Sequence, residues 1–317
     1  MQSRYYLGVD GGQSSTTALI ADEEGRVVGR GKGGPCNHAR AAEGRAKFIS
    51  AMGGCLQEAC HQAGLDSAGI SFASVCLGFS GGAEDKDQYA RELIRSKKYK
   101  ITHDAEIALS GAVPDEAGII AIAGTGSMVF GRNHRGETAR AGGWGYIYGD
   151  EGGAFDLTRR ALRAALEYEE GWGPTTDLHR MLLEAAGAEN ANQLLHSFYG
   201  GIPRSTIAAY APVVTEAALG GDPVARTILD EAAAGLTRYV HGAYNRLFSE
   251  REAVQVCYIG AVFRSEPLLN SFKEQIAASI HCQVAPPRFS PVTGALLEAL
   301  RADGNPNTPF NLPENEK

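Results

Sequence analysis

Two glycine-rich loops, each following a short apolar run, carry the residue types that bind phosphate groups. The first is Asp10-Gly11-Gly12-Gln13-Ser14-Ser15 and the second is Gly124-Thr125-Gly126-Ser127. Glycine lets backbone N–H groups approach a phosphate closely, and it permits positive φ angles. Neither loop is a Walker A sequence, and neither opens a helix as a dinucleotide fingerprint does. A single Asp-Gly-Gly is a common hairpin turn, but two loops in equivalent places indicate a bound nucleotide.

Asp10 is an acid at the end of a buried strand, beside the first loop. Mg²⁺ takes few carboxylates and keeps several waters, so an acid at this place is suited to hold Mg²⁺, directly or through water. The structural alternative is that Asp10 caps its own turn. Ser14, Ser15 and Thr125 add hydroxyl donors for phosphate oxygens. The pairing of the two loops favours the metal role for Asp10.

Asp104 is the best candidate for a general base. It follows a short strand at 100–102 and precedes a helix that starts near Ala105, where the helix N-terminus favours a carboxylate. Phosphoryl transfer to an alcohol needs a carboxylate that orients the hydroxyl and accepts its proton. The alternative is a helix N-cap, and spacing alone does not separate the two roles. His103 is expected on the opposite side of the strand, in a supporting or exposed position.

Residues 142–153 combine many glycines with Trp144, Asp150 and Glu151. Planar acceptors bind sugar hydroxyls, and a sugar face packs on aromatic or backbone surfaces, so this composition is compatible with a sugar site. The alternative is that Trp144 is a core anchor and the glycines form turns. Asn37, in the loop after Pro35-Cys36, is placed either to bind a sugar hydroxyl or to cap the helix that begins near residue 39.

Length and composition limit the classes of function. The 317 residues fit two domains, and 44% apolar with 21% charged residues is typical of a soluble globular protein. A net charge of −7 argues against nucleic-acid or anionic-membrane partners, and no apolar run approaches the roughly 20 residues that span a membrane. The start of the chain has no signal-peptide core, so we expect a cytoplasmic protein. The six cysteines form no C-x-x-C pair and are expected to be reduced.

The elements that must position these residues follow one plan twice. Strand, loop, strand, turn and strand are predicted over 5–31 and again over 118–141. Other strands are predicted over 72–79, 100–102 and 253–259, and helices over 41–63, 87–96, 105–110, 154–169, 266–280 and 292–302. This alternation predicts an α/β fold in two lobes. The lobes are expected at 1–115 and 116–317, with a helical insertion over about 154–250 and with the last helix either in the second lobe or packed back on the first. The tail from Asp303 is expected to be extended or disordered.

At these residues the sequence resembles the N-acetylglucosamine kinase family, which are BadF/BadG-type ATPase-like members of the actin, chaperone and sugar-kinase superfamily. The similarity runs from about residue 8 to 300, and its most specific part is Gly-Gly-Trp-Gly at 142–145 followed by Gly-Asp-Glu-Gly at 149–152. The match also includes Asp10–Ser14, Asn37-His38, Thr102-x-Asp104, Gly124–Ser127, Gly221-Asp222-Pro223, and Gly260 with Ser265.

The resemblance implies two ribonuclease-H-like lobes with a nucleotide and sugar cleft, and transfer of the γ-phosphate of ATP to the 6-hydroxyl of an amino sugar. N-acetylglucosamine is the expected sugar, ATP and Mg²⁺ the cofactors, and a homodimer the expected assembly. Asp104 is the implied catalytic base. The nucleotide and Mg²⁺ are expected at Asp10, Gly11, Gly12, Ser14, Ser15, Thr125, Gly126, Gly260, Ala261 and Ser265. The sugar is expected at Asn37, Ser127, Gly143, Trp144, Gly145 and Asp150.

Three positions depart from the family pattern. Gln13 replaces a usual third glycine, Ser14 replaces a common threonine, and Met128 stands where a polar residue would help to bind the sugar. The choice among N-acetylglucosamine, glucosamine and N-acetylmuramic acid therefore stays open. An alternative of another class is an activator ATPase of an acyl-CoA dehydratase or reductase, which holds an iron–sulfur cluster with cysteines, although no cysteine lies beside Gly124 here. A non-catalytic sugar sensor is a third alternative, and Asp104 argues against it.

Overall fold

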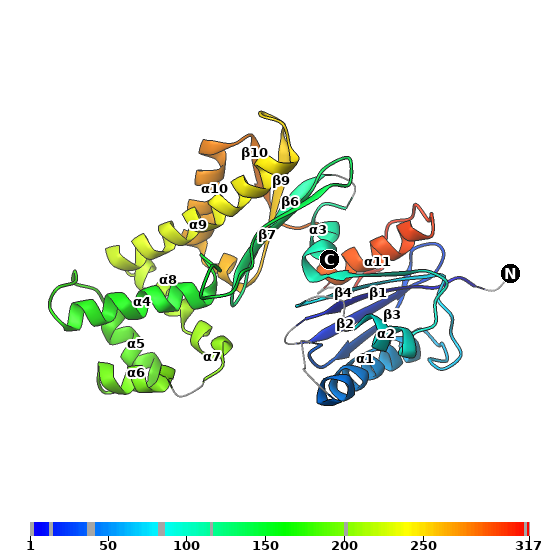
Figure 1. The fold of residues 1–317 in the computed structure, drawn as a ribbon, viewed down its shortest axis with the longest axis horizontal. Coiled ribbons are helices and arrows are strands. Elements are labelled where there is room, and N and C mark those ends of the chain that lie inside the picture. Colours follow the sequence, from blue (N-terminus) through cyan, green and yellow to red (C-terminus); the bar gives the residue numbers. More distant parts are fainter. Residues whose placement is uncertain are drawn as a thin grey trace. The chain divides into compact units, whose positions relative to one another are not determined.

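The chain folds into two compact units, one drawn from residues 1–116 and 287–317 and the other from residues 117–286. The structure is a computed structural model that describes residues 3–12, 15–36, 42–81, 86–114, 117–199, 202–313 and 316. Each unit contains one five-stranded mixed sheet with helices packed on it (Figure 1). Among the helices of these described ranges, none has the length and apolar character needed to cross a membrane.

The first unit has its sheet in the order β3-β2-β1-β4-β5. The strands are β1 (Tyr6–Gly11), β2 (Thr16–Ala21), β3 (Val27–Gly33), β4 (Ser74–Phe79) and β5 (Tyr99–His103). Strands β1, β2 and β3 are joined antiparallel, whereas β4 and β5 run parallel to β1. The carboxyl ends of β1, β4 and β5 therefore lie at one edge of the sheet, which is where ligands bind in open α/β sheets.

Helices cover both faces of this sheet. On one face lie α1 (Ala42–Gln62) and α2 (Asp87–Leu93), and on the other lie α3 (Asp104–Ala112) and α11 (Pro291–Ala302) (Figure 1). Side chains alternate along β1 as a strand requires, so that Leu7 packs in the cluster with α1 and Tyr6 in the cluster with α11.

Close packing of α1 depends on three glycines at alternate positions of β3. A Cβ at Gly29, Gly31 or Gly33 would lie 1.9–2.3 Å from a carbonyl oxygen of α1. Larger residues would therefore push the helix away from the sheet. The alternation keeps all three positions on the face that α1 covers.

The second unit repeats the sheet of the first. Its strands are β6 (Gly118–Ala123), β7 (Ser127–Arg132), β8 (Thr138–Gly142), β9 (Val254–Ile259) and β10 (Cys282–Ala285). Read as β8-β7-β6-β9-β10, they have the same order and the same antiparallel and parallel pairings as β3-β2-β1-β4-β5. The duplication predicted from the sequence is thus confirmed in the strand order. Strand β10 was not predicted, because its four residues give no clear period-2 pattern.

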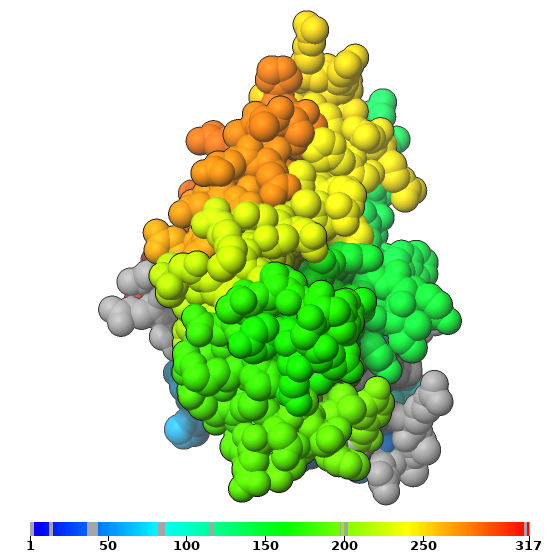
Figure 2. All heavy atoms as spheres, turned by 90° about the vertical axis from the view of Figure 1, so that its left-hand side faces the viewer, coloured from blue at the N-terminus to red at the C-terminus, as the bar shows by residue number. Residues whose placement is uncertain are grey.

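Helices fill the long connection between β8 and β9. They are α4 (Ala154–Glu169), α5 (Leu178–Ala186), α6 (Ala191–Tyr199), α7 (Arg204–Ala208), α8 (Ala211–Leu219) and α9 (Pro223–Leu247), and after β9 come the short helix η1 (Ala261–Arg264) and α10 (Glu266–Ser279). Asp222 caps α9, because its side chain accepts the N–H groups of Val224 and Ala225. Helices from this connection form a continuous face of the unit (Figure 2).

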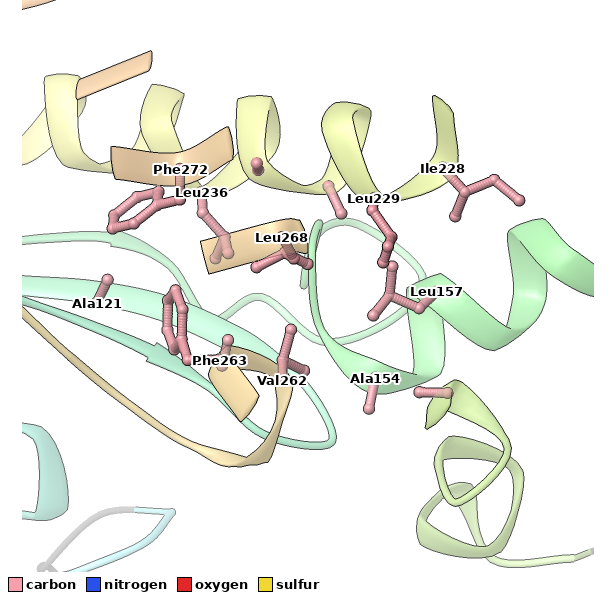
Figure 3. Packing of buried hydrophobic residues seen from close by; sticks show 14 of the residues in the cluster. Ala121, Ala154, Leu157, Ile228, Leu229, Leu236, Val262, Phe263, Leu268 and Phe272 are labelled. Carbon is pink, nitrogen blue, oxygen red and sulfur yellow. The ribbon is translucent and has the colours of Figure 1, made fainter. Parts of the chain in front are cut away.

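The core of the second unit lies where α9 meets α10, α4 and the sheet. Leu236 of α9 lies beside Leu268 and Phe272 of α10, and Leu229 of α9 faces Leu157 of α4 (Figure 3). These side chains are at most 2% exposed. Burial of each contributes about 1.5–3 kcal/mol, so this cluster anchors the connection to the sheet.

The segment after α11 is extended and ordered on the first unit. Phe310 donates its N–H to the Gly25 carbonyl and accepts the Val27 N–H, both at 3.0 Å. Glu316 is buried, and its carboxylate accepts a hydrogen bond from Arg30 at 2.5 Å. Of the two forms predicted for the tail, the extended one is observed: residues 303–304 form a turn after α11, and Phe310 then pairs through its backbone with the turn before β3.

Candidate active site

Gly12 and Ser15, the described residues of the first glycine loop outside the strands, lie between β1 and β2 and contact each other. The Gly12 N–H donates to the Ser15 carbonyl at 2.9 Å, while the Gly12 carbonyl accepts the Cys36 N–H at 3.0 Å. Gly11 is buried, Gly12 is half-buried and Ser15 is exposed. The predicted contact Ser14 lies outside the described residues, as does Asn37.

Asp10 is the residue before the last of β1 and is half-buried. Burial raises the pKa of its carboxyl to about 7, and the nearby charges of Asp104 and Glu316 act in the same direction. Asp10 and Asp104 both lie at the carboxyl-terminal edge of the first sheet, because β1, β4 and β5 run parallel. A cation stabilises the ionised form of such a carboxylate, because its charge offsets both the cost of burial and the repulsion from the nearby acids.

Asp104 is the first residue of α3, at the carboxyl end of β5. His103 caps the helix, because its Nδ1 accepts the Glu106 N–H at 3.3 Å. The N-cap alternative for Asp104 is therefore wrong, and the supporting role considered for His103 is that of the cap. The Oδ1 atom of Asp104 accepts the Ala105 N–H at 2.9 Å, and Oδ2 accepts the Ser80 hydroxyl at 2.7 Å. Each carboxylate oxygen keeps acceptor capacity for one more proton donor.

Ser80 and Lys86 support Asp104, and sequence reasoning missed both. Ser80 follows β4, and its N–H donates to the Gly11 carbonyl at 3.1 Å. Lys86 is buried and donates from Nζ to the Ser80 carbonyl at 2.7 Å. The available signal was the sequence Ser80-Gly81-Gly82 at the end of a strand parallel to β1, since such an end must lie beside the first loop.

A partly buried charge cluster fixes α3, which carries Asp104, to the rest of the first unit. Lys100 of β5 lies 2.8 Å from Glu106 of α3 and 2.5 Å from Glu298 of α11. Burial opposes the charge of Lys100, but its hydrogen bonds to Glu106 and Glu298 outweigh burial and raise its pKa. Burial likewise opposes ionisation of Glu106, and the bonds from Lys100 and Thr102 outweigh it and lower the Glu106 pKa.

The second glycine loop, between β6 and β7, is held by the first turn of α4. The Ala154 N–H donates to the Gly124 carbonyl at 2.8 Å, and the Phe155 N–H donates to the Thr125 carbonyl at 3.1 Å. A Cβ added at Gly124 would meet no described atom within 4 Å, so the backbone there borders open space. A Cβ at Gly126 would instead lie 2.3 Å from the Asp150 carboxylate. The loop is therefore open at Gly124, where a phosphate group could bind, and is packed at Gly126 against the buried Asp150 carboxylate.

Asp150 has a positive φ of 64° and is buried. Burial raises the pKa of its carboxyl, and hydrogen bonds from the backbone N–H groups of Ser127 and Gly145 oppose that rise. The Ser127 hydroxyl donates to the Glu151 carbonyl at 2.6 Å and is itself buried. Ser127 therefore helps to fix the Asp150 segment, and its oxygen remains an acceptor.

Trp144 is 68% exposed, so the core-anchor alternative is wrong. The Arg140 guanidinium lies over its ring, 4.8 Å from the centroid. Gly143 and Gly145, on either side, both have positive φ, and the Gly143 N–H donates to the Ser127 carbonyl at 3.0 Å. The structure thus brings Ser127, Gly143, Trp144, Gly145 and Asp150 together on the second unit.

Gly260 directly follows β9 and lies beside the second loop. Its φ is 114°, and a Cβ there would lie 2.1 Å from the Ala123 carbonyl oxygen, so only glycine fits this approach. Gly260 and Ala261 are exposed next to the loop. Ser265 is placed differently, because its side chain is buried and its Oγ accepts the Thr215 hydroxyl at 2.9 Å.

A model of the BadF/BadG/BcrA/BcrD ATPase family matches residues 7–299. The chain belongs to this family. The chain is 33% identical over 271 residues to the N-acetylmuramic acid/N-acetylglucosamine kinase of Clostridium acetobutylicum, covering 83% of this chain and 86% of that one. It is 27% identical over 324 residues to the N-acetyl-D-glucosamine kinase of Dictyostelium discoideum, covering 95% and 99% of the two chains.

Solved structures show that this ATPase-family chain shares its fold with sugar kinases. A proposed N-acetylglucosamine kinase from Chromobacterium violaceum matches with a TM-score of 0.75 at 26% identity, covering 93% of this chain and 98% of that one. A ROK family glucokinase from Streptomyces griseus, solved with glucose and AMPPNP, matches with a TM-score of 0.56 at 17% identity over 93% and 98% of the chains, and so supports the fold alone. The predicted α/β fold of the actin-like ATPase type is confirmed.

Proposed function

We propose that this protein is an ATP-dependent kinase that phosphorylates the 6-hydroxyl of an amino sugar, with N-acetylglucosamine as a substrate. The observation that carries the proposal is the setting of Asp104, whose two carboxylate oxygens are held by Ser80 and Ala105 at the ligand-binding edge of the first sheet. A fixed carboxylate with acceptor capacity left is what phosphoryl transfer to an alcohol requires. The relatives named as N-acetylglucosamine kinases support the same activity.

In this proposal Asp104 accepts the proton of the sugar hydroxyl. As the O–H bond breaks, the sugar oxygen bonds to the γ-phosphorus and the bond from that phosphorus to the leaving ADP oxygen breaks. Asp104 orients the hydroxyl and accepts its proton. General base catalysis of this kind raises the rate by a factor on the order of 10²–10⁴. Ser80 and Lys86 contribute by keeping the carboxylate in one orientation.

The residues present fit ATP and Mg²⁺. The backbone at Gly124 borders open space that a phosphate group can enter, and the exposed Gly260-Ala261 segment lies beside the second loop. Asp10 supplies a carboxylate of the kind that Mg²⁺ binds directly or through water. Bound Mg²⁺ would neutralise charge on the phosphates. ATP use also agrees with membership in an ATPase family.

Sugar binding is assigned to the cluster on the second unit. Asp150 offers a buried, fixed acceptor for hydroxyl groups, and the exposed Trp144 offers a flat ring. Gly143 and Gly145 offer backbone beside them. Asn37 remains a predicted sugar contact.

The activator ATPase is the second candidate considered from the sequence. Its cluster needs cysteine thiolates that reach a surface, whereas five of the six cysteines are buried, which are Cys36, Cys55, Cys60, Cys76 and Cys257. Burial raises the pKa of each of these thiols, which makes them poor thiolate ligands. Iron in the anaerobically purified protein would favour this candidate.

The test of the kinase proposal is ADP release from ATP and Mg²⁺ with a panel of sugars. The panel contains N-acetylglucosamine, N-acetylmuramic acid, glucosamine, N-acetylmannosamine and glucose. We expect sugar-dependent release with N-acetylglucosamine, and its loss when EDTA removes Mg²⁺. Release with none of the amino sugars would contradict the proposal. We also propose that the protein is a cytoplasmic protein and a homodimer. Sedimentation of the purified protein would test whether it is a dimer.

A further inference from the structure

Arg204 places a positive charge beside the cluster assigned to sugar binding. It is the first residue of α7, and its guanidinium lies over the Tyr146 ring, 5.0 Å from the centroid. Its Nη1 atom is 3.9 Å from Asp150 Oδ2. Arg204 is thus next to an acid of the sugar cluster without contacting it closely.

The guanidinium of Arg204 has donors to spare. Its separation from Asp150 exceeds a hydrogen-bond distance, and it donates no hydrogen bond to any residue in the ranges that the structure describes. Arg160, on the same unit, is different, because it donates to Asp156 at 2.9 Å and to Glu231 at 2.6 Å. The side chain of Arg204 is also 46% exposed, so a ligand can reach it.

The acids near Arg204 already have other partners. Asp150 accepts the backbone N–H groups of Ser127 and Gly145, and Glu151 accepts the Tyr239 hydroxyl. Stacking on Tyr146 fixes the plane of the guanidinium and leaves its edge for an acceptor. A planar, bidentate acceptor such as a carboxylate matches that edge best.

We propose that Arg204 binds a carboxylate carried by the amino sugar, so that the kinase acts on an acidic amino sugar of the N-acetylmuramic acid class as well as on N-acetylglucosamine. This inference rests on the proposed kinase function, and it makes Arg204 a residue that determines substrate specificity. The competing role is purely local, in which Arg204 only offsets the charge of Asp150. The two roles predict different kinetics. Only in the specificity role does the fall in kcat/KM on replacing Arg204 depend on the charge of the substrate.

The experiment compares kcat/KM for N-acetylmuramic acid, its methyl ester and N-acetylglucosamine. Arg204→Met keeps an apolar stem over Tyr146 but removes charge and donors. We expect it to lower kcat/KM for the acid by about 10- to 100-fold, the loss typical of a hydrogen bond to a charged group. The values for the ester and for N-acetylglucosamine should stay within about threefold of wild type.

Two further variants sharpen the result. Arg204→Lys keeps the charge without the fork and should show a smaller loss that is again confined to the acid. Should the Met variant fail to fold, the Lys variant carries the test. Arg226→Met is the matched control, because Arg226 pairs with Asp230 along α9 and should leave all three values unchanged.

Equal losses for all three sugars in the Arg204 variants would overturn the inference and leave Arg204 as a partner of Asp150 only. A wild-type enzyme that phosphorylates N-acetylglucosamine and the ester but not the acid would overturn it as well. A wild-type protein that turns over no amino sugar would instead contradict the kinase function on which the inference rests.

Discussion

Ser80 donates its hydroxyl to Asp104 Oδ2 at 2.7 Å, which joins the end of β4 to the first residue of α3. The same serine is tied through its backbone to Gly11 and to Lys86. The proposed base therefore depends on a residue from a different strand for its orientation. That dependence makes Ser80 the best place to separate positioning from proton acceptance.

Replacing Ser80 with alanine removes this hydrogen bond and leaves Asp104 in place. We expect kcat to fall by about 5- to 20-fold, the value of one net hydrogen bond, with little change in KM. Ser80→Thr keeps a hydroxyl and should recover much of the loss. Steady-state kinetics on purified variants make the comparison, and an alanine variant as active as wild type would show that Ser80 does not orient the base.

Gly126→Ala should destabilise the second unit, because the new Cβ would lie 2.3 Å from the Asp150 carboxylate. We expect a loss of about 1–3 kcal/mol in the free energy of unfolding, as for other overpacked sites. Gly124→Ala is the matched control, since a Cβ there meets nothing described within 4 Å. Urea unfolding measures both, and equal losses in the two variants would contradict the packing argument.

Lys100→Met should also destabilise the protein, because it removes the cation that lies 2.8 Å from the half-buried Glu106 and 2.5 Å from the buried Glu298. Removing one partner of a buried ion pair costs about 3–5 kcal/mol, and we expect somewhat less here because Lys100 is 31% exposed. Lys98→Met is the control, since Lys98 is more exposed and contacts Asp303. Thermal unfolding of both variants tests this, and a Lys100 variant no less stable than the control would refute it.

The pKa of Asp10 predicts how stability depends on pH. Its value of about 7 in the folded protein lies above the ordinary 3.8, so between these values the folded state keeps a proton that the unfolded state has lost. The contribution of Asp10 to stability is therefore present below pH 4 and is lost as the pH rises to about 7. The loss is up to about 4 kcal/mol, at about 1.4 kcal/mol per pH unit.

Asp10→Asn should remove this component. Denaturant unfolding at pH 4 to 8 in EDTA measures it, and the wild-type curve should fall more steeply with rising pH than that of the variant. Parallel curves for the two proteins would contradict the raised pKa of Asp10. EDTA is needed because a bound cation would hide the effect.

The sequence predicted the strands and loops well, because apolar runs and glycine turns are local signals. Ser80, Lys86 and Arg204 were missed, since their roles depend on which strands and helices become neighbours. The boundary at His103 and Asp104 shows the same limit. Both residue types suit a helix start, and only the backbone geometry shows that His103 is the cap. Trp144 is similar, because composition does not separate an exposed ring from a core anchor.

The most direct test of the central claim is turnover by Asp104→Asn. Asparagine keeps the size of the side chain and an acceptor for Ser80, but it cannot take the sugar proton. The measurement pairs sugar-dependent ADP release with the equilibrium dissociation constant for N-acetylglucosamine. We predict a fall in kcat of about 10²- to 10⁴-fold with binding retained within about threefold. Turnover within about tenfold of wild type would contradict the role of Asp104 as the base.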